Sequence, residues 1–167
     1  MENFMVKELW DVYNFRGEKL DKKVYRGERL KDDEFHIVVN SWIKNEDNKF
    51  LITQRVATKS FPLMWETTGG SGLSGETPIE SAIREVKEEL GIKLYKKDGK
   101  LIGKTLRYYD GCPDILYVFS FTTKNDNIKI QKEEVNDYKW ASKEEVLELY
   151  KNNKFAANAF FLDAISK

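Results

Sequence analysis

Residues 77–91 predict one helix and the face by which it packs. Thr77 is suited to the N-cap, Pro78 to the first helical position, and Glu80 to the acidic position of a capping box. Gly91 is suited to the left-handed residue that ends such a helix. At about 100° per residue, one stripe of the helix is apolar and is expected to face a core. That stripe consists of Ile79, Ala82, Ile83, Val86 and Leu90.

A second stripe of the same helix, directly beside the apolar one, carries Glu85, Glu88 and Glu89. Carboxylates three or four positions apart repel by about 0.2–0.5 kcal/mol per pair, a cost that a solvated acidic face tolerates. On that interpretation Arg84 and Glu88 form an ordinary ion pair at i,i+4. The alternative is that the carboxylates supply the hard oxygen ligands that magnesium prefers. Helix spacing alone leaves both interpretations open.

The rest of the chain contains strand-like segments and two further helices. Residues 7–27 predict two short strands around a turn at 14–18, with Gly17 as its left-handed residue. Ser142 and Glu145 form a second capping box. The other predicted strands, rich in β-branched and aromatic residues, are 35–43, 49–55, 100–109, 114–123 and 134–140. The other predicted helices are 143–153 and 154–166.

The order of these elements favours an α/β or α+β sandwich with a mixed sheet. With 167 residues and no linker or repeat, the chain is expected to form a single domain over 1–167. Residues 1–33 form its N-terminal hairpin extension.

Composition excludes several classes of protein. The 28 Lys and Arg residues balance the 28 Asp and Glu residues, which gives no overall signature of nucleic-acid binding. One cysteine and one histidine support neither an internal disulfide nor a Cys/His zinc site. The N-terminus has no signal-peptide pattern, and no apolar stretch is long enough to span a membrane. We therefore expect a cytoplasmic protein that does not bind a membrane or a nucleic acid polymer.

The stretch from residue 70 to residue 92 resembles the Nudix box. That motif reads Gly, five residues, Glu, seven residues, Arg-Glu, an aliphatic, one residue, Glu-Glu, one residue, Gly and an aliphatic. Here every position is filled, by Gly70, Glu76, Arg84, Glu85, Val86, Glu88, Glu89, Gly91 and Ile92.

The resemblance implies an α/β/α sandwich in which a loop, a helix and a second loop bind magnesium, with manganese as an alternative. It also implies a pyrophosphohydrolase whose partner is a small-molecule diphosphate, usually a nucleoside diphosphate linked to another moiety. Many members of the family are homodimers, so a homodimer is a family expectation.

Carried over by position, the resemblance makes Glu85, Glu88 and Glu89 metal ligands, with Arg84 orienting a glutamate. Glu76 lies at the loop edge, where it stabilises the motif or reaches an outer metal through water. The glycines of the loop, among them Gly69 and Gly70, allow the backbone to approach the substrate closely.

Several segments are similar to the branch of isopentenyl diphosphate isomerase: 10–20, 34–43 and 51–70. The resemblance makes Arg55 and Lys59 cations that hold the substrate diphosphate, whereas the alternative is two solvated surface charges. The isomerases' catalytic cysteine falls close to Gly70, and Cys112 lies some forty residues later. Hydrolysis is therefore favoured over isomerisation, and over a binding module, which does not need the complete acidic set.

The catalytic base and His36 remain open at this stage. The box glutamates can accept the proton of the attacking water, and the family often adds an acid from a loop before the last strand. Glu133 and Glu134 match that region, and Asp114 is a further candidate near the substrate; the alternative for each is a solvated turn acid. His36 is either a metal ligand or a hydrogen-bonded structural residue. The aromatic residues of 107–113 either stack on a base or pack against the protein.

Overall fold

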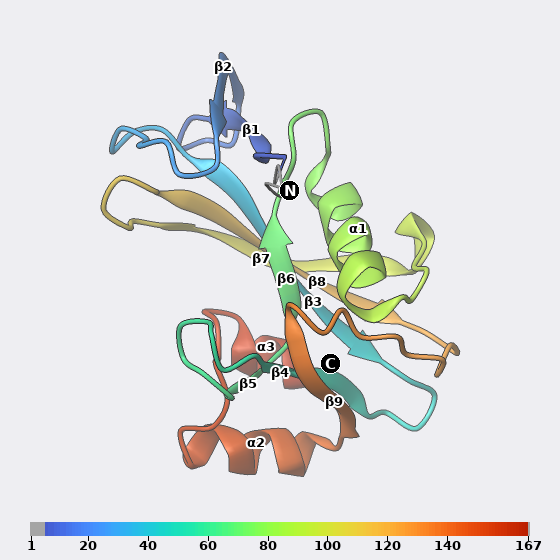
Figure 1. Cartoon of the computed structure of the whole chain (residues 1–167). Coiled ribbons are helices and arrows are strands. Elements are labelled where there is room, and N and C mark those ends of the chain that lie inside the picture. The colour runs from blue at the N-terminus through green and yellow to red at the C-terminus, as the bar shows by residue number, and fades with distance from the viewer. Residues whose placement is uncertain (1–5, 167) are drawn as a thin grey trace, which may run out of the picture.

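The computed structural model describes residues 6–166 and is built around strand β3 (His36–Lys44). Strand β8 (Asp114–Thr122) runs parallel to β3 along its whole length. On the other edge of β3, strand β6 (Thr68–Ser71) pairs antiparallel with 38–41, and β4 (Phe50–Arg55) pairs with the end of β3 (Figure 1). The predicted mixed sheet is confirmed.

The outer strands extend this sheet on both sides. Strand β7 (Gly99–Arg107) pairs antiparallel with β8. Strands β5 (Trp65–Glu66) and β9 (Val135–Ala141) both pair antiparallel with β4. The strands of the sheet lie in the order β5-β4-β3-β8-β7, with β6 paired to β3 and β9 paired to β4. The glycine-rich strand β6 therefore lies beside β3, the middle strand of this order.

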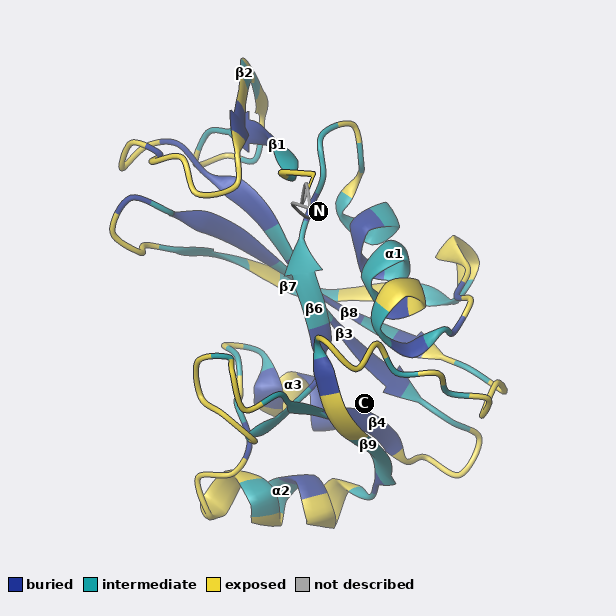
Figure 2. Cartoon of the chain, viewed as in Figure 1, coloured by how far each residue is buried: buried dark blue, intermediate teal, exposed yellow. Residues whose placement is uncertain are grey.

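Helices cover both faces of the sheet because neighbouring strand residues are apolar on both sides. One face is buried by helix α1 (Pro78–Leu90), against which Ile37 and Val39 of β3 pack. The opposite face is buried by helices α2 (Lys143–Lys151) and α3 (Phe161–Ser166), which share a core with Trp42. Figure 2 shows the buried sheet between these helices. The fold is therefore an α/β/α sandwich.

Both predicted capping boxes are present. Glu80 Oε2 accepts from the Thr77 amide at 2.9 Å, and Gly91 ends helix α1 with a φ of 70°. Ser142 Oγ accepts from the Glu145 amide at 3.1 Å and begins α2. The apolar stripe of α1 faces the core as expected, because Ala82, Val86 and Leu90 are fully buried.

The N-terminal extension is a β-hairpin, as predicted, formed by β1 (Leu9–Tyr13) and β2 (Lys19–Tyr25). Gly17 in its turn has a φ of 78°. Trp10, Val12, Val24 and Leu30 form a separate small core beneath it. The first five residues of the predicted extension lie outside the described residues.

The structure differs from the expectations in the C-terminal helix and in three short elements. The predicted helix over 154–166 is wrong for its first half, and only α3 is helical. The backbone of 154–156 instead pairs with β5, since Trp65 donates to the carbonyl of Lys154 and accepts from the amide of Ala156. Strands β5 and β6 and a short 3₁₀ helix, η1 (Lys96–Asp98), were not predicted.

Within 6–166, no helix has the length and apolar character needed to cross a membrane.

Candidate functional site

Two adjoining cavities lie where β6 passes between helix α1 and strand β3. The acidic cavity, about 310 Å³, is lined by the carboxylates Glu8, Glu85, Glu88, Glu89 and Glu134 and by the cations Arg26 and Lys59. The second, about 330 Å³, lies over β3 and is called the sheet cavity. Lys59, Gly69, Gly70 and Glu89 line both. The structure thus brings together the predicted metal ligands and the predicted substrate-binding residues.

Two glycines of β6 make the close approach between these elements possible. A Cβ on Gly70 would lie 2.3 Å from Cδ of Glu85, and a Cβ on Gly69 would lie 2.4 Å from the carbonyl oxygen of Val39. At Gly69 the obstacle is backbone, so only glycine fits there. At Gly70 a Cβ would force the Glu85 carboxyl group out of its position. The Glu85 carboxyl group therefore packs directly on the backbone of Gly70.

Arg84 joins the loop to the helix. Its Nε donates to Glu76 Oε1 at 2.7 Å, and its Nη2 donates to the carbonyl of Ser71 at 2.8 Å. Its Nη1 donates to Glu85 Oε1 at 2.8 Å and to Glu88 Oε2 at 3.1 Å. Arg84 therefore contacts the glutamates that it was expected to orient. Glu76 also accepts from Ser81 Oγ at 2.7 Å and lines neither cavity, an arrangement suited to stabilising the loop.

Within the described residues, Glu89 is the carboxylate of the acidic cavity whose side chain makes no hydrogen bond or ion pair. Glu85 and Glu88 accept from Arg84, Glu8 pairs with Arg26 at 3.1 Å, and Glu134 pairs with Lys59. Burial raises the pKa of Glu85 to about 6, although Arg84 opposes the change. Burial raises the pKa of Glu89 to about 8, and repulsion by Glu85 adds to it. The positive charge of Lys59 opposes this change, but Lys59 makes its ion pair with Glu134 and not with Glu89.

The donor set fits a hard divalent cation such as magnesium. Magnesium prefers carboxylate oxygens and keeps several waters, so it needs few protein ligands. Glu89 offers an uncompensated carboxylate, and Glu85 lies beside it on the same cavity wall. Among residues 6–166, no three His, Cys, Asp or Glu side chains are grouped as a complete metal-ligand set. The fit therefore rests on donor type and on charge.

The two predicted diphosphate cations both line the sheet cavity. Arg55 Nη1 donates to Glu66 Oε2 at 2.7 Å, and its Nε donates to the carbonyl of Ser60. Lys59 pairs with Glu134, a candidate base that lines the acidic cavity. Arg55 and Lys59 are thus fixed by acidic partners rather than extended into solvent. Glu133, the other acid of that loop, is exposed and lines neither cavity.

Asp114 and His36 lie outside both cavities. Asp114 is buried and binds Arg107 with both oxygens, so it is not placed as a base. His36 stacks on Trp10 at 4.1 Å, and its Nε2 lies 3.4 Å from Cys112 Sγ. Burial lowers the pKa of His36 to about 4, as expected for a neutral packed imidazole. Its contact with Cys112, 76 residues away, was not visible in the sequence.

The sequence also gave no sign of the polar residues in the sheet cavity. Asn40 Oδ1 accepts from Thr67 Oγ1 and from Asn158 Nδ2, both at 2.8 Å. Arg107, from β7, lines the same cavity. These residues belong to no motif and meet only through the sheet topology and the loop before α3.

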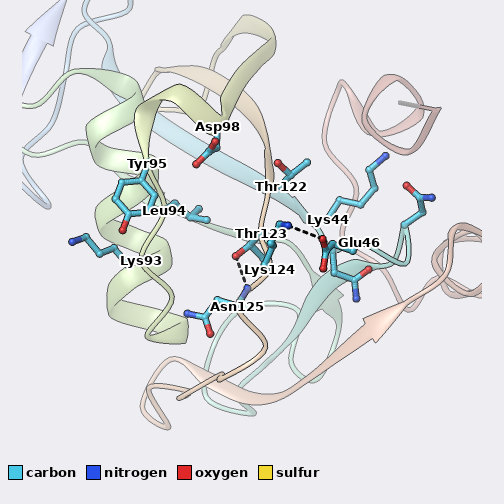
Figure 3. Close-up of a pocket in the computed structure, with 12 residues that line it drawn as sticks. Lys44, Glu46, Lys93, Leu94, Tyr95, Asp98, Thr122, Thr123, Lys124 and Asn125 are labelled. Atoms are coloured by element: carbon cyan, nitrogen blue, oxygen red, sulfur yellow. Dashed lines mark hydrogen bonds and ion pairs between the residues drawn. The ribbon is translucent and has the colours of Figure 1, made fainter.

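Figure 3 shows a larger cavity, about 770 Å³, at the end of the β3–β4 hairpin. Tyr95 and Asp98 line it from the segment after α1, and an ion pair of 3.0 Å between Lys124 and Glu46 lies at its rim. No residue predicted for catalysis, metal binding or substrate binding lines this cavity. Size alone therefore does not locate the functional site.

Comparisons with known proteins identify the family and the fold to which the chain is similar. The NUDIX domain profile matches residues 34–162. An uncharacterized Nudix hydrolase of Listeria monocytogenes is 34% identical over 160 residues, which cover 95% of this chain and 93% of that protein. An isopentenyl-diphosphate Delta-isomerase of Shigella boydii is 28% identical over 124 residues, covering 70% of this chain and 66% of that protein. The crystal structure of DR0079 from Deinococcus radiodurans superposes with a TM-score of 0.72 at 21% identity, covering 95% and 98% of the two chains.

Proposed function

The chain belongs to the NUDIX family, and on that premise we propose that it is a magnesium-dependent hydrolase of a small organic diphosphate. The substrate is a nucleoside diphosphate derivative or a related organic diphosphate. One observation carries the proposal: an unpartnered, half-buried carboxylate, Glu89, lies beside Glu85 in a cavity that adjoins a second, cation-lined cavity. An anionic substrate and a divalent cation together complement these charges.

The residues of the two cavities have different proposed roles, in metal binding, positioning and substrate binding. Glu85, Glu88 and Glu89 would hold magnesium, which when bound supplies positive charge to the diphosphate oxygens. Arg84 fixes the orientation of Glu85, and the bare backbone of Gly70 leaves room for that carboxyl group. Arg55 and Lys59 would contact the diphosphate from the sheet cavity.

The reaction is attack of water on phosphorus with cleavage of the bridging P–O bond. The water loses a proton to a carboxylate, and the bridging oxygen leaves with the second phosphoryl group or with the organic phosphate. Glu134 and Glu89 line the acidic cavity and are the candidates for the base. Glu134 is held beside Lys59, which places it at the border of the two cavities.

Isomerisation is the less favoured reaction despite the similarity to an isomerase. The position near which those enzymes carry a catalytic cysteine is Gly70 here, and a side chain on Gly70 would collide with Glu85. Cys112, which lies some forty residues after Gly70 in the sequence, contacts His36 outside both cavities. These placements support hydrolysis.

An activity screen tests the proposal. The purified protein is incubated with Mg²⁺ and a panel of nucleoside diphosphate derivatives and isoprenoid diphosphates, and phosphate, monophosphates and isomers are measured. Glu85→Gln should lose most of the turnover. Glu80→Gln is the matched control, because Glu80 lies on the same helix in the capping box and lines neither cavity. Equal activity of the two variants would contradict the assignment.

A further inference from the structure

The sheet cavity is lined by a fixed cation that the proposed reaction does not use. Arg107 Nε donates to Asp114 Oδ1 at 2.7 Å, and its Nη2 donates to Asp114 Oδ2 at 2.8 Å. Asp114 is 3% exposed, so this carboxylate holds the guanidinium in one orientation. Nη1 of Arg107 has no hydrogen-bond partner among residues 6–166. A rigid guanidinium with an unused donor therefore lines a cavity.

The walls around Arg107 are polar and held in place. Asn158, in the loop before α3, donates to Asn40 Oδ1 on β3 at 2.8 Å and accepts from the Phe160 amide at 3.0 Å. These bonds tie the loop to the floor of the cavity. Of the described residues that line the cavity, none is aromatic. Aromatic side chains provide the usual stacking surface for a nucleobase, and this cavity provides none.

The cavity has room for a small organic group. Its volume of about 330 Å³ equals roughly ten water-sized groups at about 30 Å³ each. Arg55 and Lys59, the residues expected to contact the diphosphate, line the sheet cavity, and Lys59 also lines the acidic cavity. Arg107 comes from β7, on the other side of β3 and β8 from the strand β4 that carries Arg55. A substrate that spans both cavities therefore presents its organic end to Arg107.

We infer that Arg107, oriented by Asp114, selects organic diphosphates whose small, non-aromatic organic end carries a carboxylate or a similar anionic acceptor. This inference rests on the proposed function and narrows its substrate class away from nucleotides. Arg107 is a specificity-determining residue, and Asp114 is a positioning residue that acts through it. The two N–H groups of Nη1 match an anionic acceptor on the organic end of the substrate.

Three probes separate the parts of this inference. Mevalonate 5-diphosphate carries a carboxylate on a short acyclic chain, isopentenyl diphosphate has a similar chain without it, and cytidine diphosphate carries an aromatic base. Hydrolysis with Mg²⁺ is followed by phosphate release. For the wild type, the KM for mevalonate 5-diphosphate should be at least about tenfold below that for each other probe.

The informative variant carries Arg107→Gln and Asp114→Asn together, because it removes both charges without leaving a buried carboxylate unpaired. Its KM for mevalonate 5-diphosphate should rise by about tenfold with kcat nearly retained, while the KM for isopentenyl diphosphate stays within about twofold. Lys104→Met is the control, since Lys104 is an exposed cation on the same strand that lines neither cavity.

Preference for cytidine diphosphate, or an equal change of all three KM values in the double variant, overturns the inference and leaves the hydrolase intact. If no probe or other diphosphate is hydrolysed, the proposed function fails instead. Calorimetric titration of the same three probes then decides the inference separately. Tighter binding of mevalonate 5-diphosphate that depends on Arg107 supports it, and equal or absent binding overturns it.

Discussion

Replacing Glu89 by glutamine should stabilise the metal-free protein while removing most of its turnover. The folded protein raises the pKa of Glu89 from 4.5 to about 8, so it favours the protonated carboxyl group. The unfolded chain at pH 7 has this group ionised. At about 1.4 kcal/mol per pKa unit, the difference corresponds to about 3 kcal/mol of lost stability at pH 7. Glutamine is neutral in both states and avoids this cost.

The sign of the pH dependence follows from the same shift. Between about pH 4.5 and pH 8 the folded protein binds more protons at Glu89 than the unfolded chain does, so stability falls as pH rises. The advantage of Glu89→Gln should therefore be small at pH 5 and largest near pH 8. Relaxation of the side chain toward water reduces the effect, and we expect about 1–2 kcal/mol, or about 3–6 °C in Tm.

Thermal unfolding with chelator at pH 5, 6, 7 and 8 measures this effect. Glu88→Gln is the matched control, because Glu88 lies on the same helix with its side chain 53% exposed and paired with Arg84. Added Mg²⁺ should raise the Tm of the wild type more at pH 8 than at pH 5.5, since binding requires the ionised carboxylate. A Glu89→Gln protein that is less stable than the wild type at pH 8, or a pH trend shared with Glu88→Gln, would refute the reasoning.

Three further predictions concern the two cavities and Cys112. Gly70→Ala should destabilise the fold by about 1–3 kcal/mol and reduce turnover, because its Cβ displaces the Glu85 carboxyl group. Chemical denaturation measures the stability, and phosphate release measures the turnover. A variant with unchanged stability and turnover would contradict the contact. Arg55→Ala with Lys59→Ala should raise KM more than it lowers kcat, and an unchanged KM would remove both from the substrate. Cys112→Ser should leave hydrolysis nearly intact, with no allylic isomerisation in either protein; dimethylallyl diphosphate formed by the wild type and lost in the variant would restore the isomerase.

The fold was predictable where local signals and core pattern agreed. The capping boxes at Thr77 and Ser142 marked helix starts correctly because they satisfy amide groups that any helix leaves unpaired. The strands with two buried faces were equally clear from their continuous apolar sequences. The C-terminal segment was different, because the backbone of 154–156 pairs with Trp65 instead of forming a helical turn. That pairing joins segments about ninety residues apart and leaves no local pattern.

Strand β6 shows how the site limits local prediction. Its sequence, Thr-Gly-Gly-Ser, has low strand propensity, yet it pairs with β3 over four residues. Glycine is required there because the carbonyl of Val39 and the carboxyl group of Glu85 occupy the space of a side chain. Gly69 and Gly70 made β6 unrecognisable as a strand. The same two glycines allow β6 to pack close to β3 and to helix α1. The rule that glycine disfavours strands therefore fails at the place where the two cavities meet.

The glutamate stripe was visible in the sequence, but the difference among its members was not. All three carboxylates share one helix face, yet Arg84 pairs with Glu85 and Glu88, and Glu89 has no ion-pair partner within residues 6–166. That asymmetry depends on Glu76 and on the Ser71 carbonyl, which hold the guanidinium on the loop side of the helix. Because Glu89 and Lys59 both line the border of the two cavities, a cation held at Glu89 would also meet an anion attracted by Lys59. On the proposed function, the uneven pairing of the three glutamates would therefore couple metal binding to substrate binding.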